Sequence, residues 1–573
     1  MKVIGSLTAV CCLALATLVQ AGSATWSINP GSNDWDTATN WMPATIPNGI
    51  FDIATFGTST VTNVSVTATP YHNLASLRFD PGADAYTISA SGNAAGLQFA
   101  GDGIVNNSGA TQEFVATDHG LFDFYQSASC GDLTNFTILG GMVFFEGEGS
   151  ASTAHFTVSD STGAFGDVEF FDSSTAANAT FDIGINGEVD VAGASSPSAV
   201  FNVVGGIVAF QQAVNAGESI IDCSEGGQAI FTTIPTAPLG SPQVTAHGAT
   251  SSGGLPAQIY FSESATADHG VFIVEGGTVA GAEGAALIMK QHSSLQNATV
   301  TLTGGSSGAS GGSLSFQRTS DGGKATVVMT GNAVLNIRNL VSSSVAIGSL
   351  AGEGSVYLGA NTLTIGSNNL STTFSGVIQD DGGLTKTGSG TLMLSGANLY
   401  TGGTTVTSGA LKVANRTGSA TGTGTVSVNA GTLGGRGIIG GATTIGTGSG
   451  AGAFLEPSVA ARQSATTTIQ SLLTFKADGS YTCKLDTKKA RADEVVANGV
   501  TIESGAQFNF SAIGNKRLPL GSVFVALSNT SASPISGAFA NLADGSTLSA
   551  GKNKYQASYT GGDGNELTLT VVP

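Results

Sequence analysis

A short apolar phrase recurs along most of this chain, and its spacing limits the possible folds more than any other feature. Each copy starts with a bulky apolar residue, alternates polar and apolar residues, and ends near a glycine, as in "NFTILGG" at 135–141. The leading residues of successive copies lie 20, 25, 20, 71, 28 and 27 residues apart, and the gap of 71 fits three ordinary intervals. This interval is too long for a hairpin meander and too short for a domain, so it predicts one turn of a β-solenoid per copy. The leading residues are Phe136, Phe156, Phe181, Phe201, Phe272, Val300 and Val327.

In such a fold each turn contributes about three short strands, which pair with the equivalent strands of the neighbouring turns. The resulting parallel sheets have strands about 4.8 Å apart. Inward side chains form columns, in which each buried residue contributes about 1.5–3 kcal/mol. The predicted fold is therefore all-β, a parallel β-helix of roughly fifteen turns over the repeated part. An array of antiparallel β-sandwiches is the second interpretation for the middle of the chain.

Composition agrees with a folded β protein and excludes some classes of partner. The chain of 573 residues has 82 Gly, only 14 Pro and 10% charged residues, yet keeps enough Val, Ile, Leu and Phe for a core, which is unlike a disordered chain. Its net charge of −19 argues against nucleic acid and anionic membrane surfaces as partners.

The first residues have the pattern of a secretory signal peptide. Lys2 precedes an apolar core, and small residues follow. We therefore expect a signal peptide within residues 1–24, with cleavage after Ala21 or Ala24. No later stretch reaches about 18 apolar residues, so we expect no integral membrane segment after cleavage. The chain is thus expected to be exported, to the cell surface, the outer membrane or the extracellular space.

Both ends of the repeated part differ from its middle, as expected for structures that cover open solenoid ends. Trp26, Trp35 and Trp41 lie close together in the sequence with several prolines and predict a compact aromatic plug. An exposed aromatic platform that binds sugars is the alternative for these three residues. The expected organisation is an N-terminal cap with the first coils at 25–120, the β-helix at 121–463, and a small β cap at 464–573.

The cysteines after the signal peptide give no sign of a disulfide framework or a metal site. They are three in number and widely separated, which predicts buried small residues, or at most one incidental pair. They are Cys130, Cys223 and Cys483.

A stretch with regularly spaced glycines and very little charge, "TGSGTLMLSGANLYTGGTTVTSGALKV" at 387–413, resembles the autotransporter-associated β-strand repeat of bacterial surface proteins. Residues 422–446 resemble the coils that follow such repeats, and the two ends of the chain are similar to the ends of proteins that carry them. The resemblance implies an exported, right-handed parallel β-helix of the passenger type, with its repeat at 384–413. It depends on Lys386, Gly388, Gly390, Leu392, Leu394, Gly396, Asn398, Tyr400, Gly402, Gly403, Thr404, Val406, Gly409, Leu411 and Val413.

The family's membrane translocator is a barrel of many alternating strands. Only 160 residues follow Val413, and they lack aromatic girdles, so we expect this chain to lack a translocator barrel of its own.

The sequence offers only scattered candidates for catalysis. Glycosidases need two carboxylates across the scissile bond, and polysaccharide lyases need acidic residues together with a basic one. The acidic candidates are Asp172, Glu188, Asp190, Asp380 and Asp381, and the histidine candidates are His119 and His269. Basic residues gather instead near the C-terminus, at Lys484, Lys488, Lys489, Arg491, Lys516 and Arg517.

We therefore expect a structural or adhesive protein without catalytic residues, metal or cofactor, whose partners are glycans or proteins of the cell surface or extracellular space. A polysaccharide lyase or glycosidase on the same scaffold is the alternative. A glycan-binding protein is a third interpretation. The irregular segment 207–269 is where a binding groove is most expected.

Overall fold

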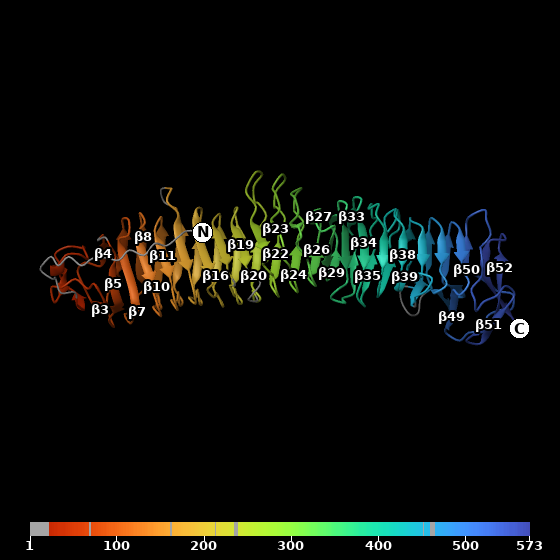
Figure 1. Ribbon diagram of the computed structural model, residues 1–573, viewed down its shortest axis with the longest axis horizontal. Coiled ribbons are helices and arrows are strands. Elements are labelled where there is room, and N and C mark those ends of the chain that lie inside the picture. Colours follow the sequence, from red (N-terminus) through yellow and green to blue (C-terminus); the bar gives the residue numbers. More distant parts are fainter. Residues whose placement is uncertain are drawn as a thin grey trace, which may run out of the picture. The chain divides into compact units, whose positions relative to one another are not determined.

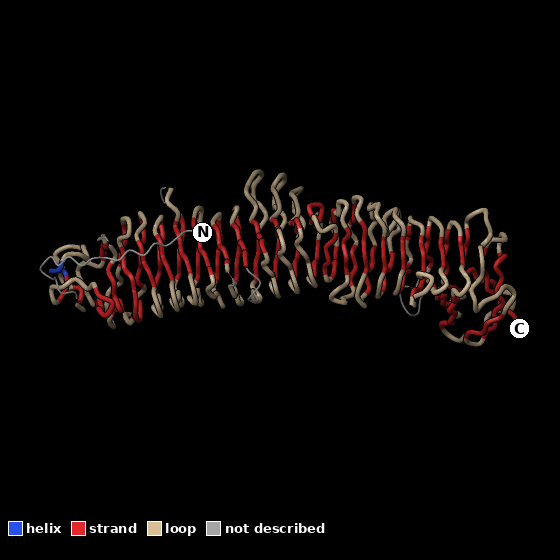
Figure 2. The backbone as a smooth tube through the Cα atoms, viewed as in Figure 1, coloured by secondary structure: helices blue, strands red, loops and turns tan. Residues whose placement is uncertain are grey.

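The computed structural model describes residues 22–67, 70–160, 163–212, 214–233, 239–450, 452–458 and 464–573. The expected signal peptide lies almost wholly outside these described residues. The chain divides into two compact units, Met1–Thr180 and Phe181–Pro573, here called unit 1 and unit 2. Both consist of short strands joined by turns and loops, and unit 1 also contains a short 3-10 helix at Ala38–Asn40 (Figures 1 and 2).

In each unit the strands stack as a parallel β-solenoid, with about 19 turns in all, which confirms the predicted fold class. In unit 1, Phe114, Phe136 and Phe156 are register partners in consecutive turns, and their rings stack with centroids 4.9 and 4.8 Å apart. These spacings match the distance between neighbouring strands of a sheet. Their strands are β8 (Gln112–Thr117), β10 (Thr134–Leu139) and β12 (His155–Ser159).

A second column of stacked rings lines the facing sheet of unit 1. Its centroids are 5.0, 5.0 and 4.4 Å apart, and all four rings are fully buried. Because like side chains pack over like, each turn buries its apolar residues against the turns on either side. The column consists of Phe99, Phe124, Phe145 and Phe170, on β7 (Gly96–Asn106), β9 (Leu121–Phe124), β11 (Met142–Phe145) and β13 (Gly166–Phe170).

In unit 2 the register explains the long gap of 71 residues between two copies of the apolar phrase. Phe201 is paired with Ile221, Ile221 with Val244, and Val244 with Phe272. Three turns thus fill the gap, as the interval predicts. The strands of Ile221 and Val244 take the place of the recurring apolar phrase without having its full sequence pattern. The strands are β16 (Val200–Val204), β18 (Ile220–Ser224), β20 (Gln243–Ala246) and β22 (Val271–Val274). The antiparallel sandwich array is therefore wrong for this region.

The N-terminal cap is the predicted aromatic plug. Trp26, Trp35 and Trp41 are at most 2% exposed, and the ring of Trp41 contacts the other two edge-on, with centroids 5.1 and 4.7 Å away. The Trp41 indole N–H donates to the Trp35 carbonyl at 2.8 Å. An exposed sugar platform of these three residues is therefore wrong, because their faces are buried.

At the C-terminus, parallel stacking continues beyond the expected start of the cap at residue 464. β45 (Gly479–Asp486) pairs in parallel with β49 (Gln507–Ile513) over seven residues. A two-residue antiparallel pair joins β45 to β46 (Arg491–Ala492). The antiparallel cap itself starts at β50 (Val523–Asn529), which pairs with β53 (Glu566–Val572), followed by β52 (Asn553–Gly561) and β51 (Thr547–Ala550). The long alternating strands at 479–513 look like cap strands in sequence, but they are solenoid strands.

The three cysteines of the described residues are buried and form no disulfide, which agrees with the prediction of buried small residues. No helix among the described residues is long and apolar enough to cross a membrane.

Candidate functional site

The glycine-rich segment 384–413 forms one turn of unit 2 and part of the next. β35 (Thr391–Leu394) pairs with β37 (Ala410–Val413), so that Leu392 lies over Leu411 and Leu394 over Val413. On the adjoining face, β34 (Gly383–Lys386) pairs with β36 (Thr404–Val406). The apolar positions of the repeat are thus the core contacts between turns.

Asn398 ties three consecutive turns together from a buried position. Its Oδ1 accepts a hydrogen bond from the Ile378 amide at 2.8 Å, and its Nδ2 donates to the Ala420 carbonyl at 2.5 Å. In the same turn the Tyr400 hydroxyl, fully buried, lies 2.6 Å from the Thr404 hydroxyl. Asn398 therefore satisfies two buried backbone groups, one of them in β33 (Val377–Gln379), which pairs with β30 (Ser355–Tyr357) on the preceding turn.

Two glycines of the repeat are required by close backbone contact. Gly388 has φ +68°, and a Cβ there would lie 1.9 Å from the Gly366 carbonyl oxygen. Gly409 has φ +64°, and its Cβ would lie 2.3 Å from the Gly388 carbonyl oxygen. Glycines therefore stack on successive turns at this corner. Without a Cβ they can adopt a positive φ and allow the backbones of neighbouring turns to come into contact. Beside them, Lys386 Nζ donates to the Gly388 carbonyl at 3.0 Å, and burial lowers the pKa of Lys386 to about 8.

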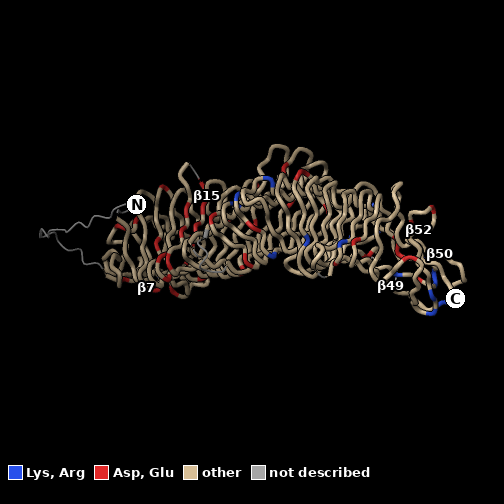
Figure 3. The backbone as a smooth tube through the Cα atoms, turned by 45° about the vertical axis from the view of Figure 1, so that its right-hand side comes forward, with Lys and Arg blue, Asp and Glu red and all other residues tan. Residues whose placement is uncertain are grey.

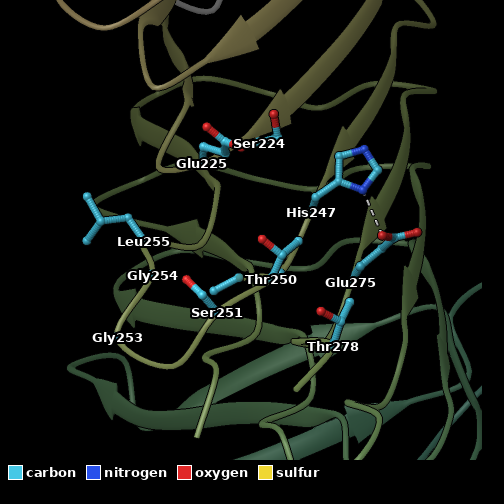
Figure 4. Close-up of a pocket in the computed structure, with 12 residues that line it drawn as sticks. Ser224, Glu225, His247, Thr250, Ser251, Gly253, Gly254, Leu255, Glu275 and Thr278 are labelled. Carbon is cyan, nitrogen blue, oxygen red and sulfur yellow. Dashed lines mark hydrogen bonds and ion pairs between the residues drawn. The ribbon is translucent and has the colours of Figure 1, made fainter. Parts of the chain in front are cut away.

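A separate feature of unit 2 is a hollow of about 580 Å³ beside three loops that project from successive turns (Figures 1 and 4). The projecting loops are residues 248–257, 276–285 and 304–312. They continue the stacking of the turns, because the Ala249 amide donates to the Glu283 carbonyl at 2.8 Å and the Ser306 amide to the Gly277 carbonyl at 3.0 Å. A small buried cluster of Ala249, Ala282 and Ala309 joins the loops at their base.

His247 lies at the edge of this hollow and bridges three turns. Its Nε2 is 2.6 Å from Asp222 Oδ1, and its Nδ1 is 2.7 Å from Glu275 Oε2. Burial by itself would lower the pKa of His247, but the two carboxylates outweigh it and raise that pKa above the ordinary value. The imidazolium form satisfies both carboxylates at once, so the group acts as an ionic clasp.

The lining of the hollow is suited to holding a polar ligand. It offers the hydroxyls of Thr250, Ser251 and Thr278, the carboxylate of Glu225, and the exposed side chain of Leu255 (Figure 4). Both nitrogens of His247 face carboxylates, so the imidazole is not free to act as a general base. Among the described residues, no group of three or more His, Cys, Asp or Glu is arranged to hold a metal ion.

The acidic candidates from the sequence are not brought together as a catalytic pair. Asp380 accepts two hydrogen bonds from the Arg338 guanidinium, at 2.8 and 2.7 Å, and one from the Gly359 amide at 2.9 Å. The Arg338 hydrogen bonds hold the pKa of Asp380 below its usual value. Asp381 accepts from the Thr401 hydroxyl at 3.0 Å, so both residues support corners of the solenoid.

The other candidates lie apart from the hollow or in the other unit. Glu188 and Asp190 project from β15 (Gly187–Ala192) in unit 2, whereas exposed Asp172 belongs to unit 1. His119 belongs to unit 1, and His269 belongs to unit 2, where it pairs with its neighbour Asp268 at 2.8 Å.

The segment 207–269 supplies most of the hollow, but His247, Asp222 and Glu275 were not among the candidate residues predicted from the sequence. These three residues are far apart in sequence and lie on consecutive turns. His247 and Glu275 directly follow the paired strands β20 and β22, whereas Asp222 lies within β18 and is the register partner of Thr245. The glycine pairs at 276–277 and 304–305, spaced 28 residues apart, are the signal that could have revealed the stacked loops.

Comparison with known proteins bears on the repeat. Residues 384–413 match the family described as passenger-associated-transport-repeat. The chain is also 35% identical over 108 residues to the adhesin BmaC autotransporter of Brucella suis biovar 1 (strain 1330). That stretch is 18% of this chain and 3% of the adhesin, so the chain matches only a small part of the relative's length. The two matches and the solenoid fold confirm the resemblance to autotransporter passengers.

Proposed function

We propose that this chain is an exported structural and adhesive element of the bacterial cell surface or extracellular space, and that it acts without catalysis. The observation that carries the proposal is the passenger-associated-transport repeat at 384–413, built into a parallel solenoid. Similarity to part of an autotransporter adhesin supports the same class. The mechanism would be mechanical: a stiff stack of turns that presents regular outer faces and, at 248–312, projecting loops.

Fractionation of the producing cell tests export. We expect the protein in the surface or extracellular fraction, shortened at its N-terminus after Ala21 or Ala24, and degraded by protease added to intact cells. Recovery of the uncleaved chain from the cytoplasm would contradict the proposal.

Activity assays test the absence of catalysis. Purified protein is incubated with plant and algal polysaccharides, and reducing and unsaturated ends are measured. We expect no release above buffer. Cleavage that disappears in a Glu275→Gln variant would instead support an enzyme centred on the hollow.

Glycan binding at the hollow is the second candidate function, because hydroxyls and a carboxylate converge there beside the projecting loops. A glycan array tests it with the natural chain and a Thr250→Ala/Ser251→Ala variant. A bound glycan whose signal falls at least tenfold in the variant would favour this function. The matched control is Thr319→Ala, outside the hollow.

A further inference from the structure

Basic residues gather in three neighbouring loops and the adjoining strand ends at the C-terminal end of unit 2 (Figure 3). Most of them already cluster in the sequence, and the fold adds Lys552 and Lys554 from the hairpin between β51 and β52. All of them are exposed. The patch, called the basic patch below, consists of Lys488, Lys489, Arg491, Lys516, Arg517, Lys552 and Lys554.

Polar contacts between the three loops hold them together and so fix the basic residues near one another. The Lys516 amide donates to the Thr487 hydroxyl at 3.2 Å. Asn553, which is buried, donates from Nδ2 to the Lys516 carbonyl at 3.0 Å and accepts from the Leu518 amide at 2.8 Å. Arg517, Lys552 and Lys554 thereby line one hollow of about 340 Å³.

The patch is almost unneutralised within its own molecule. Asp486 is the acidic residue closest to it, 4.0 Å from Lys489 Nζ, and its side chain is 7% exposed. Its Oδ1 already accepts the backbone amides of Lys488 and Lys489. Among the described residues, no other member of the patch has an ion pair within 4.0 Å. Seven like charges held together in this way repel one another and favour an anionic partner.

The same chain carries a strongly acidic region. Residues 22–289 contain 26 Asp and Glu and a single basic residue, Arg78. Within unit 2 the first turns, residues 182–283, hold ten of these acidic residues and no Lys or Arg; we call them the acidic turns. The turns formed by residues 290–486 lie between the acidic turns and the basic patch. One molecule therefore cannot bring these two surfaces of unit 2 together.

We propose that the basic patch docks on the acidic turns of a second copy of this chain. The two surfaces are complementary in charge, and every copy presents both. Because the surfaces differ, the contact is heterologous, so it leaves a free basic patch on one copy and free acidic turns on the other. Such contacts extend into open assemblies rather than closed dimers. Exposed charges are screened beyond about 8 Å at physiological ionic strength, so attraction depends on this local match rather than on the net charge of −19.

Sedimentation velocity of the purified full chain at about 0.05 M and about 0.5 M NaCl tests the contact. We expect concentration-dependent association at low salt that weakens at least tenfold at high salt. A Lys516→Gln/Arg517→Gln/Lys552→Gln/Lys554→Gln variant is expected to stay monomeric at both. The matched control is Arg318→Gln/Lys324→Gln/Arg416→Gln/Arg436→Gln, which removes the same charge from exposed residues elsewhere and should associate like the natural chain. Circular dichroism checks that both variants keep their β structure.

Mixing a basic-patch variant with the natural chain distinguishes the proposed contact from other modes of self-association. A labelled basic-patch variant retains its acidic turns, so it should still join the natural chain although it does not join itself. Association that survives the patch substitutions, or a natural chain that is monomeric at both salt concentrations, would overturn the proposal. Dextran sulfate and vesicles containing anionic phospholipid serve as further probes. Patch-dependent binding to either, without self-association, would assign the patch to a different polyanion and also overturn it.

Discussion

Replacing Asn398 with Ala tests whether the polar side chains of the repeat stabilise the packing of consecutive turns. The substitution removes the acceptor of the Ile378 amide and the donor to the Ala420 carbonyl, and both of these residues are fully buried. A buried polar group that loses its partner costs about 1–3 kcal/mol, so two such groups predict a loss of about 2–6 kcal/mol. Because turns of a solenoid contact only their neighbours, the effect should concentrate in residues 378–420.

Hydrogen exchange measured by mass spectrometry reads this local stability directly. Peptides covering 378–420 should exchange at least tenfold faster in Asn398→Ala, since about 1.4 kcal/mol corresponds to a factor of ten. The control is Asn297→Ala, whose exposed side chain makes no hydrogen bond among the described residues. Equal exchange in the two variants would refute the idea that Asn398 holds the turns together.

Three further outcomes follow from the geometry. Gly388→Ala places a Cβ 1.9 Å from a carbonyl oxygen at φ +68°, so urea unfolding should show a loss of more than about 3 kcal/mol, whereas Gly57→Ala, with open space around it, should be close to neutral. The raised pKa of His247 means that its clasp stabilises the fold fully below pH about 6.5 and loses this contribution as pH rises through the raised pKa. Once exchange rates are corrected for the intrinsic pH dependence of amide exchange, protection in 248–285 should therefore fall across that range in the natural chain, and His247→Gln should remove this extra fall. Burial raises the pKa values of the cysteine thiols, so a thiol reagent at pH 8 should modify them only after denaturation; reaction in the folded chain would contradict their placement at Cys130, Cys223 and Cys483.

The solenoid could be predicted because its core repeats a local signal at nearly constant spacing. Phe136 and Phe156 are 20 residues apart in sequence and one turn apart in space. The same reasoning placed three turns between Phe201 and Phe272 without any phrase to mark two of them. The start of the antiparallel cap was harder, because alternation in strands such as 479–486 is the same for parallel and antiparallel pairing.

The clasp and the hollow could not be predicted from local patterns. Asp222 lies within β18, and His247 and Glu275 directly follow β20 and β22, so these residues meet only through the register of three consecutive turns. The lengths of the connecting loops do not show that register. The burial of Trp35 likewise depends on how the cap folds over the first turns, which an aromatic cluster in sequence leaves open.

The account depends most on the parallel register of neighbouring turns, which cysteine cross-linking can test. Thr364 and Thr385 are register partners on adjacent turns, and both side chains are partly exposed. Strands about 4.8 Å apart place their Cα atoms within the range that a disulfide spans. Under mild oxidation a Thr364→Cys/Thr385→Cys variant should form the cross-link, and a Thr362→Cys/Thr385→Cys variant, two residues out of register, should form little. Equal cross-linking of both pairs, or none in the first, would contradict the stacked parallel turns.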